Sequence, residues 1–189
     1  MSLTVARPDV APMSFGWADP PYLGCGRLYA AHHPEALVWD DPAAHVALLS
    51  RLADEYRDGW AVALHVPSLP LYVSHMPTGS RVGVWCKSFA SFKPNVNPAY
   101  TWEPMIWCGG RTAKARGGKS ATTIRDHLVA PIAMLRGLPG AKPDAYNAWV
   151  LDVLGFMVGD TVADLFPGTG SMGREVARRA SAPHLWSVA

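Results

Sequence analysis

Hydrophobic and polar positions along the chain follow two periods in turn, which predicts strands and helices in alternation. Short apolar runs typical of buried strands lie at 14–18, 60–66, 81–87, 102–108 and 161–164. Apolar residues with helical spacing follow Asp41-Pro42, Lys142-Pro143-Asp144 and Ser171. This alternation predicts an α/β fold with a mostly parallel, doubly wound sheet.

Details of the pattern refine this arrangement. The run at 60–66 is apolar on both faces, which favours a central position in the sheet. The runs at 81–87 and 102–108 predict an antiparallel hairpin at one edge, and Pro104 favours a bulge or an edge position for the second. Shorter elements are expected as helices at 68–77 and 122–128 and as a strand at 184–188.

Composition is typical of a globular protein. The 189 residues suffice for one sizeable core, the hydrophobic content of 49% excludes a disordered chain, and no apolar run is long enough to span a bilayer. Residues 1–13 lack a secretory pattern, so we expect a flexible N-terminus, a single domain over 14–189 and a cytoplasmic location without membrane contact. The cysteines are odd in number and widely spaced, so neither a disulfide framework nor a metal site is expected.

A cationic segment separates the hairpin from the helix after Pro143. Residues 109–120 contain no acidic side chain, although the net charge of the whole chain is only +2. Within a basic insert at 109–140, the candidate phosphate contacts are Arg111, Lys114, Arg116 and Lys119. A solvated loop explains the same charges. Because so short an insert has few side chains to contact bases, we expect weak sequence specificity, or recognition completed by a partner subunit or a second copy.

Candidate chemistry begins where the first apolar run ends, at Asp19-Pro20-Pro21-Tyr22. Neither proline has an N–H to donate, so the carbonyls of Asp19 and Pro20 can point outward as acceptors beside the Asp19 carboxylate. Tyr22 adds an aromatic surface. An amine on a flat ring, such as the exocyclic amine of adenine, fits this group, although a plain turn at a strand end has the same composition.

A glycine-rich loop near the other end of the chain provides a second candidate site. The stretch from Gly159 to Gly173 predicts a turn, a short strand ending at Asp164, a loop and a helix start. The loop contains Phe166, Gly168 and Gly170, and its glycines allow close approach of a nucleoside-like ligand. The glycine spacing fits neither the dinucleotide fingerprint nor a phosphate-binding P-loop.

Together, Asp-Pro-Pro-Tyr at 19–22 and Asp-x-Phe-x-Gly-x-Gly at 164–170 resemble the S-adenosylmethionine-dependent amino-methyltransferases that act on adenine N6 or cytosine N4 in nucleic acid. The motif order resembles the circularly permuted class, and the resemblance covers about residues 15–179. It implies a Rossmann-like methyltransferase fold, S-adenosylmethionine as cofactor and catalysis by the first motif. It further implies a cofactor-side role for Lys142 and Pro143 and a target-base pocket near 100–104.

The chain departs from this family on the cofactor side, where the sheet is shortened. The family's next strand normally ends in an acid that binds the cofactor ribose, and no acid follows Glu175 here. The exposed sheet edge expected there invites a partner strand or a homodimer. Adenine N6 in DNA is the favoured target. Cytosine N4, RNA adenine and a degenerate, non-catalytic nucleic-acid-binding subunit are the alternatives, and a phage or restriction-modification setting is left open.

Overall fold

The computed structural model describes residues 10–31, 33–89, 94, 96–112, 115–116, 123–133 and 140–181. Within these ranges, strands form one six-stranded sheet in the order β5-β3-β4-β2-β1-β6. The strands are β1 (Ser14–Ala18), β2 (Gly59–Ala63), β3 (Arg81–Lys87), β4 (Trp102–Gly109), β5 (His127–Ala130) and β6 (Thr161–Asp164). β4 is antiparallel to both of its neighbours, and the other pairings are parallel. The expected α/β architecture and antiparallel hairpin are confirmed, but β5 lies outside β3, so the hairpin is one strand in from the edge.

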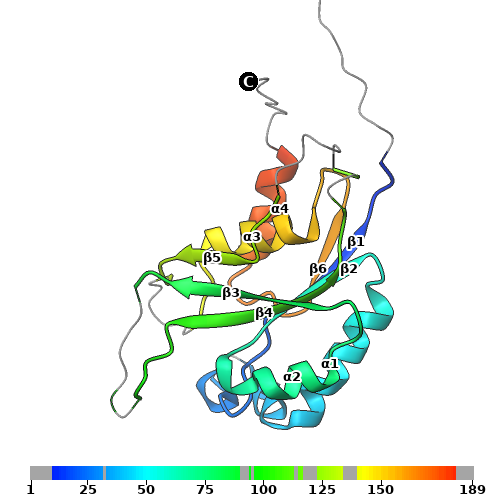
Figure 1. Ribbon diagram of the computed structural model, residues 1–189. Helices are drawn as coiled ribbons and strands as arrows, with labels where there is room; N and C mark the ends of the chain where they lie inside the picture. Colours follow the sequence, from blue (N-terminus) through cyan, green and yellow to red (C-terminus); the bar gives the residue numbers. More distant parts are fainter. Residues whose placement is uncertain are drawn as a thin grey trace, which may run out of the picture.

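Helices cover both faces of the sheet (Figure 1). The longer helices are α1 (Pro42–Glu55) and α2 (Leu69–His75) on one face, and α3 (Asp144–Leu154) and α4 (Ser171–Ser181) on the other. The described part of the chain also contains three short 3-10 helices, η1 (Gly26–Leu28), η2 (Pro34–Asp40) and η3 (Val66–Ser68). α1 begins as predicted, because Asp41 Oδ1 accepts the Ala43 N–H at 2.9 Å and Pro42 fills the first turn. None of the described helices is long and apolar enough to cross a membrane.

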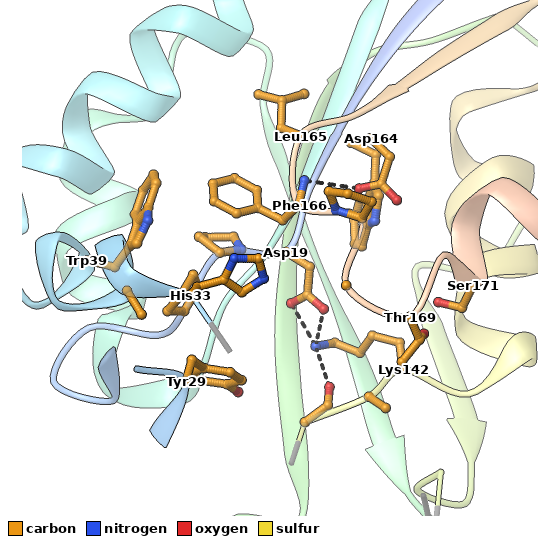
Figure 2. A pocket seen from close by; sticks show the side chains of 18 of the residues that line it. Asp19, Tyr29, His33, Trp39, Lys142, Asp164, Leu165, Phe166, Thr169 and Ser171 are labelled. Carbon is orange, nitrogen blue, oxygen red and sulfur yellow. Dashed lines mark hydrogen bonds and ion pairs between the residues drawn. The ribbon is translucent and has the colours of Figure 1, made fainter. Parts of the chain in front are cut away.

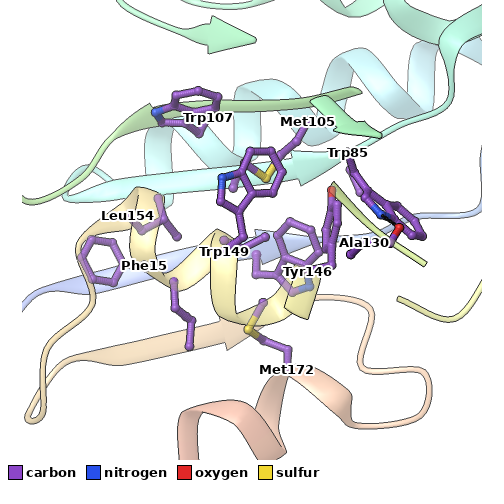
Figure 3. Packing of buried hydrophobic residues seen from close by; sticks show 14 residues of the cluster. Phe15, Trp85, Met105, Trp107, Ala130, Tyr146, Trp149, Leu154 and Met172 are labelled. Atoms are coloured by element: carbon purple, nitrogen blue, oxygen red, sulfur yellow. Dashed lines mark hydrogen bonds between the residues drawn. The ribbon is translucent and has the colours of Figure 1, made fainter. Parts of the chain in front are cut away.

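Two hydrophobic clusters hold the layers together. Under α3, the Tyr146 ring contacts Trp17 and Trp85 of the sheet and Trp149 of its own helix. Figure 3 shows Trp85, Tyr146 and Trp149 in this cluster. The opposite cluster joins α1 and α2 to side chains such as Val62. Alternate residues of β1 and β2 therefore face opposite clusters, which fixes the strand register and the direction in which each loop leaves the sheet.

The structure corrects the prediction for residues 122–128. Instead of a helix, His127–Ala130 forms β5, an edge strand parallel to β3. The Val84 N–H donates to the Asp126 carbonyl at 3.1 Å, and Trp85 Nε1 donates to the Ala130 carbonyl at 2.9 Å. β3 thus satisfies backbone groups of this segment, and tertiary pairing overrides the local helical pattern.

The expectation for Pro104 is wrong as well. β4 lies between β2 and β3, and its register with β3 runs from Arg81↔Trp107 to Cys86↔Trp102 without a bulge. Proline is tolerated because β2 ends at Ala63, beside it, and the Pro104 carbonyl still accepts the Leu64 N–H at 3.2 Å. The strand expected at 184–188 lies outside the described residues.

Candidate active site

The two sequence motifs leave the sheet at the same edge. β1 and β6 are parallel neighbours with Trp17 opposite Asp164, so the residues that follow both strands emerge side by side. The Leu165 N–H donates to the Trp17 carbonyl at 2.9 Å, and Asp164 Oδ1 accepts the Phe166 N–H at 3.2 Å. Figure 2 shows Asp19 and Phe166 facing the same space.

Lys142 joins the first motif to the segment before α3. Its ammonium donates to Asp19 Oδ1 at 2.8 Å and Oδ2 at 2.9 Å (Figure 2). It also donates to the Tyr22 hydroxyl at 2.9 Å. The Gly140 carbonyl lies 3.4 Å from the same nitrogen. The Lys142 side chain is only 4% exposed, so this is a buried ion pair. The family resemblance implies a cofactor-side role for Lys142, which stays a prediction, and the structure adds contacts of its ammonium with the first motif.

The network continues through Glu103 to Lys87. The Tyr22 hydroxyl donates to Glu103 Oε2 at 2.7 Å, and Lys87 Nζ lies 2.6 Å from Glu103 Oε1. Lys142 Nζ is 3.7 Å from Glu103 Oε2. Two ammonium groups and two carboxylates thus balance one another around the tyrosine hydroxyl.

Burial and pairing act in opposite directions on these charges. Burial raises the pKa of Asp19, and the Lys142 ammonium lowers it in part. For Glu103, the opposing effect of Lys142 and Lys87 exceeds that of burial and holds its pKa below the ordinary value. For Lys142, burial favours the neutral amine, but the carboxylates of Asp19 and Glu103 prevail and raise its pKa. Burial and the nearby carboxylates raise the pKa of Tyr22, so its hydroxyl stays a donor.

A first cavity of about 390 Å³ lies between the two motifs. It is bounded by the ends of β1 and β6, the segment that contains η1 and η2, and the start of α3. Trp39 packs edge-to-face on Phe166, with ring centroids 4.9 Å apart. Seven predicted site residues line this cavity: Asp19, Pro20, Pro21, Lys142, Asp164, Phe166 and Gly168. This volume is within the ordinary range for small-molecule sites.

A second cavity of about 380 Å³ lies on the other side of the Lys142 network. Tyr22, the last residue of the first motif, lines it and stacks on His65 with centroids 5.1 Å apart. Other walls come from charged and aromatic side chains of β3, β4 and the connection between them, namely Trp85, Lys87, Tyr100, Trp102 and Glu103. The resemblance implies a target-base pocket near 100–104, and three residues of that segment, Tyr100, Trp102 and Glu103, line this cavity.

Tyr29, Gly140 and Ala141 line both cavities and so form the partition between them. Gly140 has φ +83°, and a Cβ there would lie 2.6 Å from the Tyr29 hydroxyl oxygen. Only glycine allows this close approach of the two segments. Sequence reasoning identified neither Tyr29 nor Gly140, because their contact depends on residues 111 positions apart in the chain.

Two predicted cofactor residues lie beside the first cavity without being among its lining residues. Pro143 is the N-cap residue of α3, next to Lys142. Gly170 precedes α4 with φ +72°, and its N–H donates to the Pro167 carbonyl at 2.5 Å. Both residues therefore determine the backbone conformation beside the first cavity.

The prediction that Arg111 contacts phosphate is contradicted. Its side chain is 4% exposed and pairs with Asp160 Oδ1 at 2.5 Å. It donates to the carbonyls of Gly155 and Ala11, both at 3.3 Å. Arg116 is half-buried beside Gly155, with its Cδ 3.2 Å from the place of a Cβ on that glycine. Lys114 and Lys119 lie outside the described residues.

Neither a protein-family model nor a curated protein sequence matches this chain. Among solved structures, the crystal structure of the M1.HpyAVI–SAM complex superimposes with a TM-score of 0.55 at 14% identity, over 88% of this chain and 77% of that chain. A crystal structure of M1.HpyAVI superimposes with a TM-score of 0.49 at 12% identity, over 89% of this chain and 77% of that chain. The architecture is that of a Rossmann-like methyltransferase fold.

Proposed function

We propose that this chain is an S-adenosylmethionine-dependent methyltransferase that methylates the exocyclic amine of a nucleic-acid base, with adenine N6 of DNA as its target. One observation carries the proposal. The first motif spans the junction of two cavities, with Asp19 in the wall of one and Tyr22 in the wall of the other. This arrangement suits group transfer, because it can hold a donor and an acceptor close together and oriented at one residue cluster.

The first cavity fits the cofactor. Gly168, with φ +45°, keeps the loop backbone open to a ligand, and the loop leads into the N-terminus of α4. Trp39 and Phe166 provide aromatic surface, and Asp164 provides an acceptor. When bound, S-adenosylmethionine supplies an electrophilic sulfonium methyl, whose bonding electron pair stays on the departing sulfur. The shared fold with the M1.HpyAVI–SAM complex supports this assignment.

The second cavity fits a base rotated out of its stack. Its aromatic side chains, among them Tyr22 and Trp102, can cover a flat ring. Unstacking costs a few kcal/mol, which such contacts offset. Since His65 stacks on Tyr22 and Lys142 Nζ lies over the same ring, 5.1 Å from its centroid, a base meets Tyr22 at its edge.

Asp19 holds the target amine in this proposal. Its two oxygens have lone pairs beyond those used by Lys142, so the carboxylate can accept from the amine while the ion pair persists. The Pro20 carbonyl is the second acceptor. As the nitrogen uses its electron pair to form the N–C bond, it becomes positive, and the Asp19 carboxylate stabilises that charge until the nitrogen loses a proton.

The test is methyl transfer by the purified chain from labelled cofactor to duplex DNA, single-stranded DNA and RNA. Mass spectrometry of digested nucleosides should find N6-methyladenine in DNA. N4-methylcytosine, or label in RNA alone, would identify one of the alternative targets. Nucleic-acid binding without detectable cofactor binding at millimolar concentration would support the non-catalytic subunit. A homodimer or partner at the β6 edge stays a prediction, as do the phosphate contacts of Lys114, Arg116 and Lys119.

A further inference from the structure

One wall of the first cavity comes from η2, a segment that places few side chains in the core. Among the η2 side chains whose burial the structure describes, Ala36 is buried and Trp39 half-buried, while the others are exposed. Trp39 lines the cavity beside Phe166 of the glycine-rich loop, and Figure 2 shows these two rings next to each other. The position of this aromatic wall therefore depends on what holds Trp39 from behind.

His45 of α1 holds Trp39 from that side. It is 1% exposed, and its Nε2 lies 2.7 Å from the Trp39 carbonyl oxygen. The two rings also pack edge-to-face, with centroids 5.4 Å apart. On the other side of His45, Nδ1 lies 2.7 Å from the hydroxyl of Tyr72, a buried residue of α2. Ring contacts thus run without a break from α2 to the first cavity, in the order Tyr72, His45, Trp39 and Phe166.

The two partners of His45 fix the tautomer of its ring. A carbonyl oxygen can only accept, so Nε2 carries the hydrogen and donates to Trp39. Nδ1 is then the acceptor, and the Tyr72 hydroxyl donates to it. Burial lowers the pKa of His45, although the Trp39 carbonyl, Asp40 and Asp41 act in the opposite direction. Burial also raises the pKa of Tyr72. Both groups therefore stay neutral near pH 7, and each hydrogen bond keeps one direction.

His45 acts at a distance from any ligand, because it lines neither of the two described cavities. A hydrogen bond has a narrow range of distance and angle, so it fixes the Trp39 backbone more closely than apolar packing alone. We propose that His45 is a positioning residue for cofactor binding: it holds Trp39 beside Phe166 and so shapes the wall that receives the flat adenine ring of S-adenosylmethionine. This inference rests on the proposed function, because it concerns the same cofactor, and it adds a residue that lies outside both motifs.

The test is a double-mutant cycle on the affinity for S-adenosylmethionine, measured by isothermal titration calorimetry. Trp39→Leu removes the aromatic wall, and His45→Leu removes the group that holds it. We expect affinity to fall about 10- to 30-fold in Trp39→Leu and about 5- to 10-fold in His45→Leu. Because His45 acts through Trp39, the double variant should bind at most about twofold more weakly than Trp39→Leu alone. Multiplication of the two losses in the double variant, or wild-type affinity of His45→Leu, would overturn the inference.

Tyr72→Phe provides a second variant, which removes one oxygen atom and keeps the ring contacts. Without the Tyr72 donor, Nδ1 of His45 can carry the hydrogen, and Nε2 then has none to donate to Trp39. Affinity for S-adenosylmethionine should therefore fall about threefold in Tyr72→Phe, and this loss should disappear when Trp39→Leu is also present. A threefold loss in both backgrounds would show that the hydroxyl acts by another route and would contradict the proposal.

A matched control separates positioning from a general loss of stability. Leu52→Val changes another buried side chain of α1 that lines neither cavity, so affinity for S-adenosylmethionine should stay within about twofold of wild type. At saturating cofactor, His45→Leu should transfer methyl groups at the wild-type rate within about twofold. Equal loss of affinity in Leu52→Val, or a slower rate at saturation in His45→Leu, would overturn the inference and leave the proposed function intact. If the wild-type chain does not bind S-adenosylmethionine, the proposed function fails and this inference fails with it.

Discussion

Two buried ion pairs lie at opposite ends of β1, and their surroundings differ. At the start of the strand, Arg111 pairs with Asp160, which also accepts the N–H groups of Met13 at 2.8 Å and Met157 at 2.7 Å. Neither of the two described cavities is lined by Arg111 or Asp160. The pair satisfies backbone groups from several segments and fastens β1 to the ends of β4 and α3.

At the end of β1, the pair between Lys142 and Asp19 lies between two cavities. A second carboxylate, Glu103, is close by. Burial of a charge pair alone therefore does not identify a functional site. Adjacent cavities do, because they leave space in which a ligand can reach the charged groups.

Removal of the structural pair should have the largest effect on stability. Arg111→Met leaves the Asp160 carboxylate buried without its cation, which should lower the free energy of unfolding by about 3–5 kcal/mol. Urea denaturation followed by circular dichroism measures this change. Arg57→Met, at an exposed arginine, is the matched control and should change it by less than about 0.5 kcal/mol.

The same variant tests the corrected role of Arg111. At a temperature where Arg111→Met is folded, its DNA affinity and the salt dependence of that affinity should equal those of wild type. A phosphate contact would instead reduce the slope of log affinity against log salt by about one. That result would show that Arg111 contacts nucleic acid. The Arg111–Asp160 pair could then no longer be described as purely structural.

Removal of the Asp19 carboxylate, at the other end of β1, should lower the rate of methyl transfer more than the free energy of unfolding. Asp19→Asn keeps the shape of the side chain but replaces a carboxylate oxygen with an N–H donor, and loses the charge that stabilises the developing cation. We expect the rate of methyl transfer to fall about 100- to 1,000-fold in a single-turnover assay. Cofactor affinity should change much less. Undiminished transfer by Asp19→Asn would refute the catalytic assignment.

The meeting of the two motifs could be predicted from the sequence because local signals located both strand ends. Asp19-Pro20 and Asp164 each end an apolar run, and parallel strands bring such ends to one edge. The proline before α3 and Gly155 after it marked that helix correctly. In these places each signal lies within a few residues of the feature that it predicts.

The remaining features depend on partners distant in sequence. Lys142 is 123 residues from Asp19, and Arg111 is 49 residues from Asp160, so composition could not tell which cation is buried. A cluster of basic residues suggests phosphate contact whether its members are exposed or buried. β5 is likewise defined by pairing with β3 and not by its own pattern. His45 carries no sequence signal, since its contacts with Trp39 and Tyr72 are visible only in the packed structure.

Lys142 should affect the pH dependence of the reaction more than its maximum rate. Burial raises the pKa of Asp19, and the ammonium opposes that rise, so Lys142→Met should raise the pKa further. The amine needs the ionised carboxylate as acceptor, so activity falls as pH drops through this pKa. The acid limb of the rate profile should move upward by about 1 to 3 pH units, with activity recovering at high pH.

Arg81→Met is the control for this experiment, because it removes an exposed cation on the same sheet. Its profile should coincide with that of wild type. If Lys142→Met lowers activity equally at every pH, the ammonium does not control ionisation of Asp19. Only the adjacent cavities would then distinguish the Lys142–Asp19 pair, as a functional pair, from the structural pair Arg111–Asp160.

Glu103→Gln should have a smaller effect, confined to one cavity. Glutamine keeps an acceptor for the Tyr22 hydroxyl but loses the charge paired with Lys87. Glu103 lines the second cavity and not the first, so the KM for nucleic acid should rise about tenfold while affinity for S-adenosylmethionine stays within about twofold of wild type. Steady-state kinetics with each substrate varied in turn measure both values. Lys142 contacts both Asp19 in the wall of the first cavity and Tyr22 in the wall of the second. Weaker cofactor binding in this variant would therefore show that the charge network couples the cavities, and the assignment of one ligand to each would need revision.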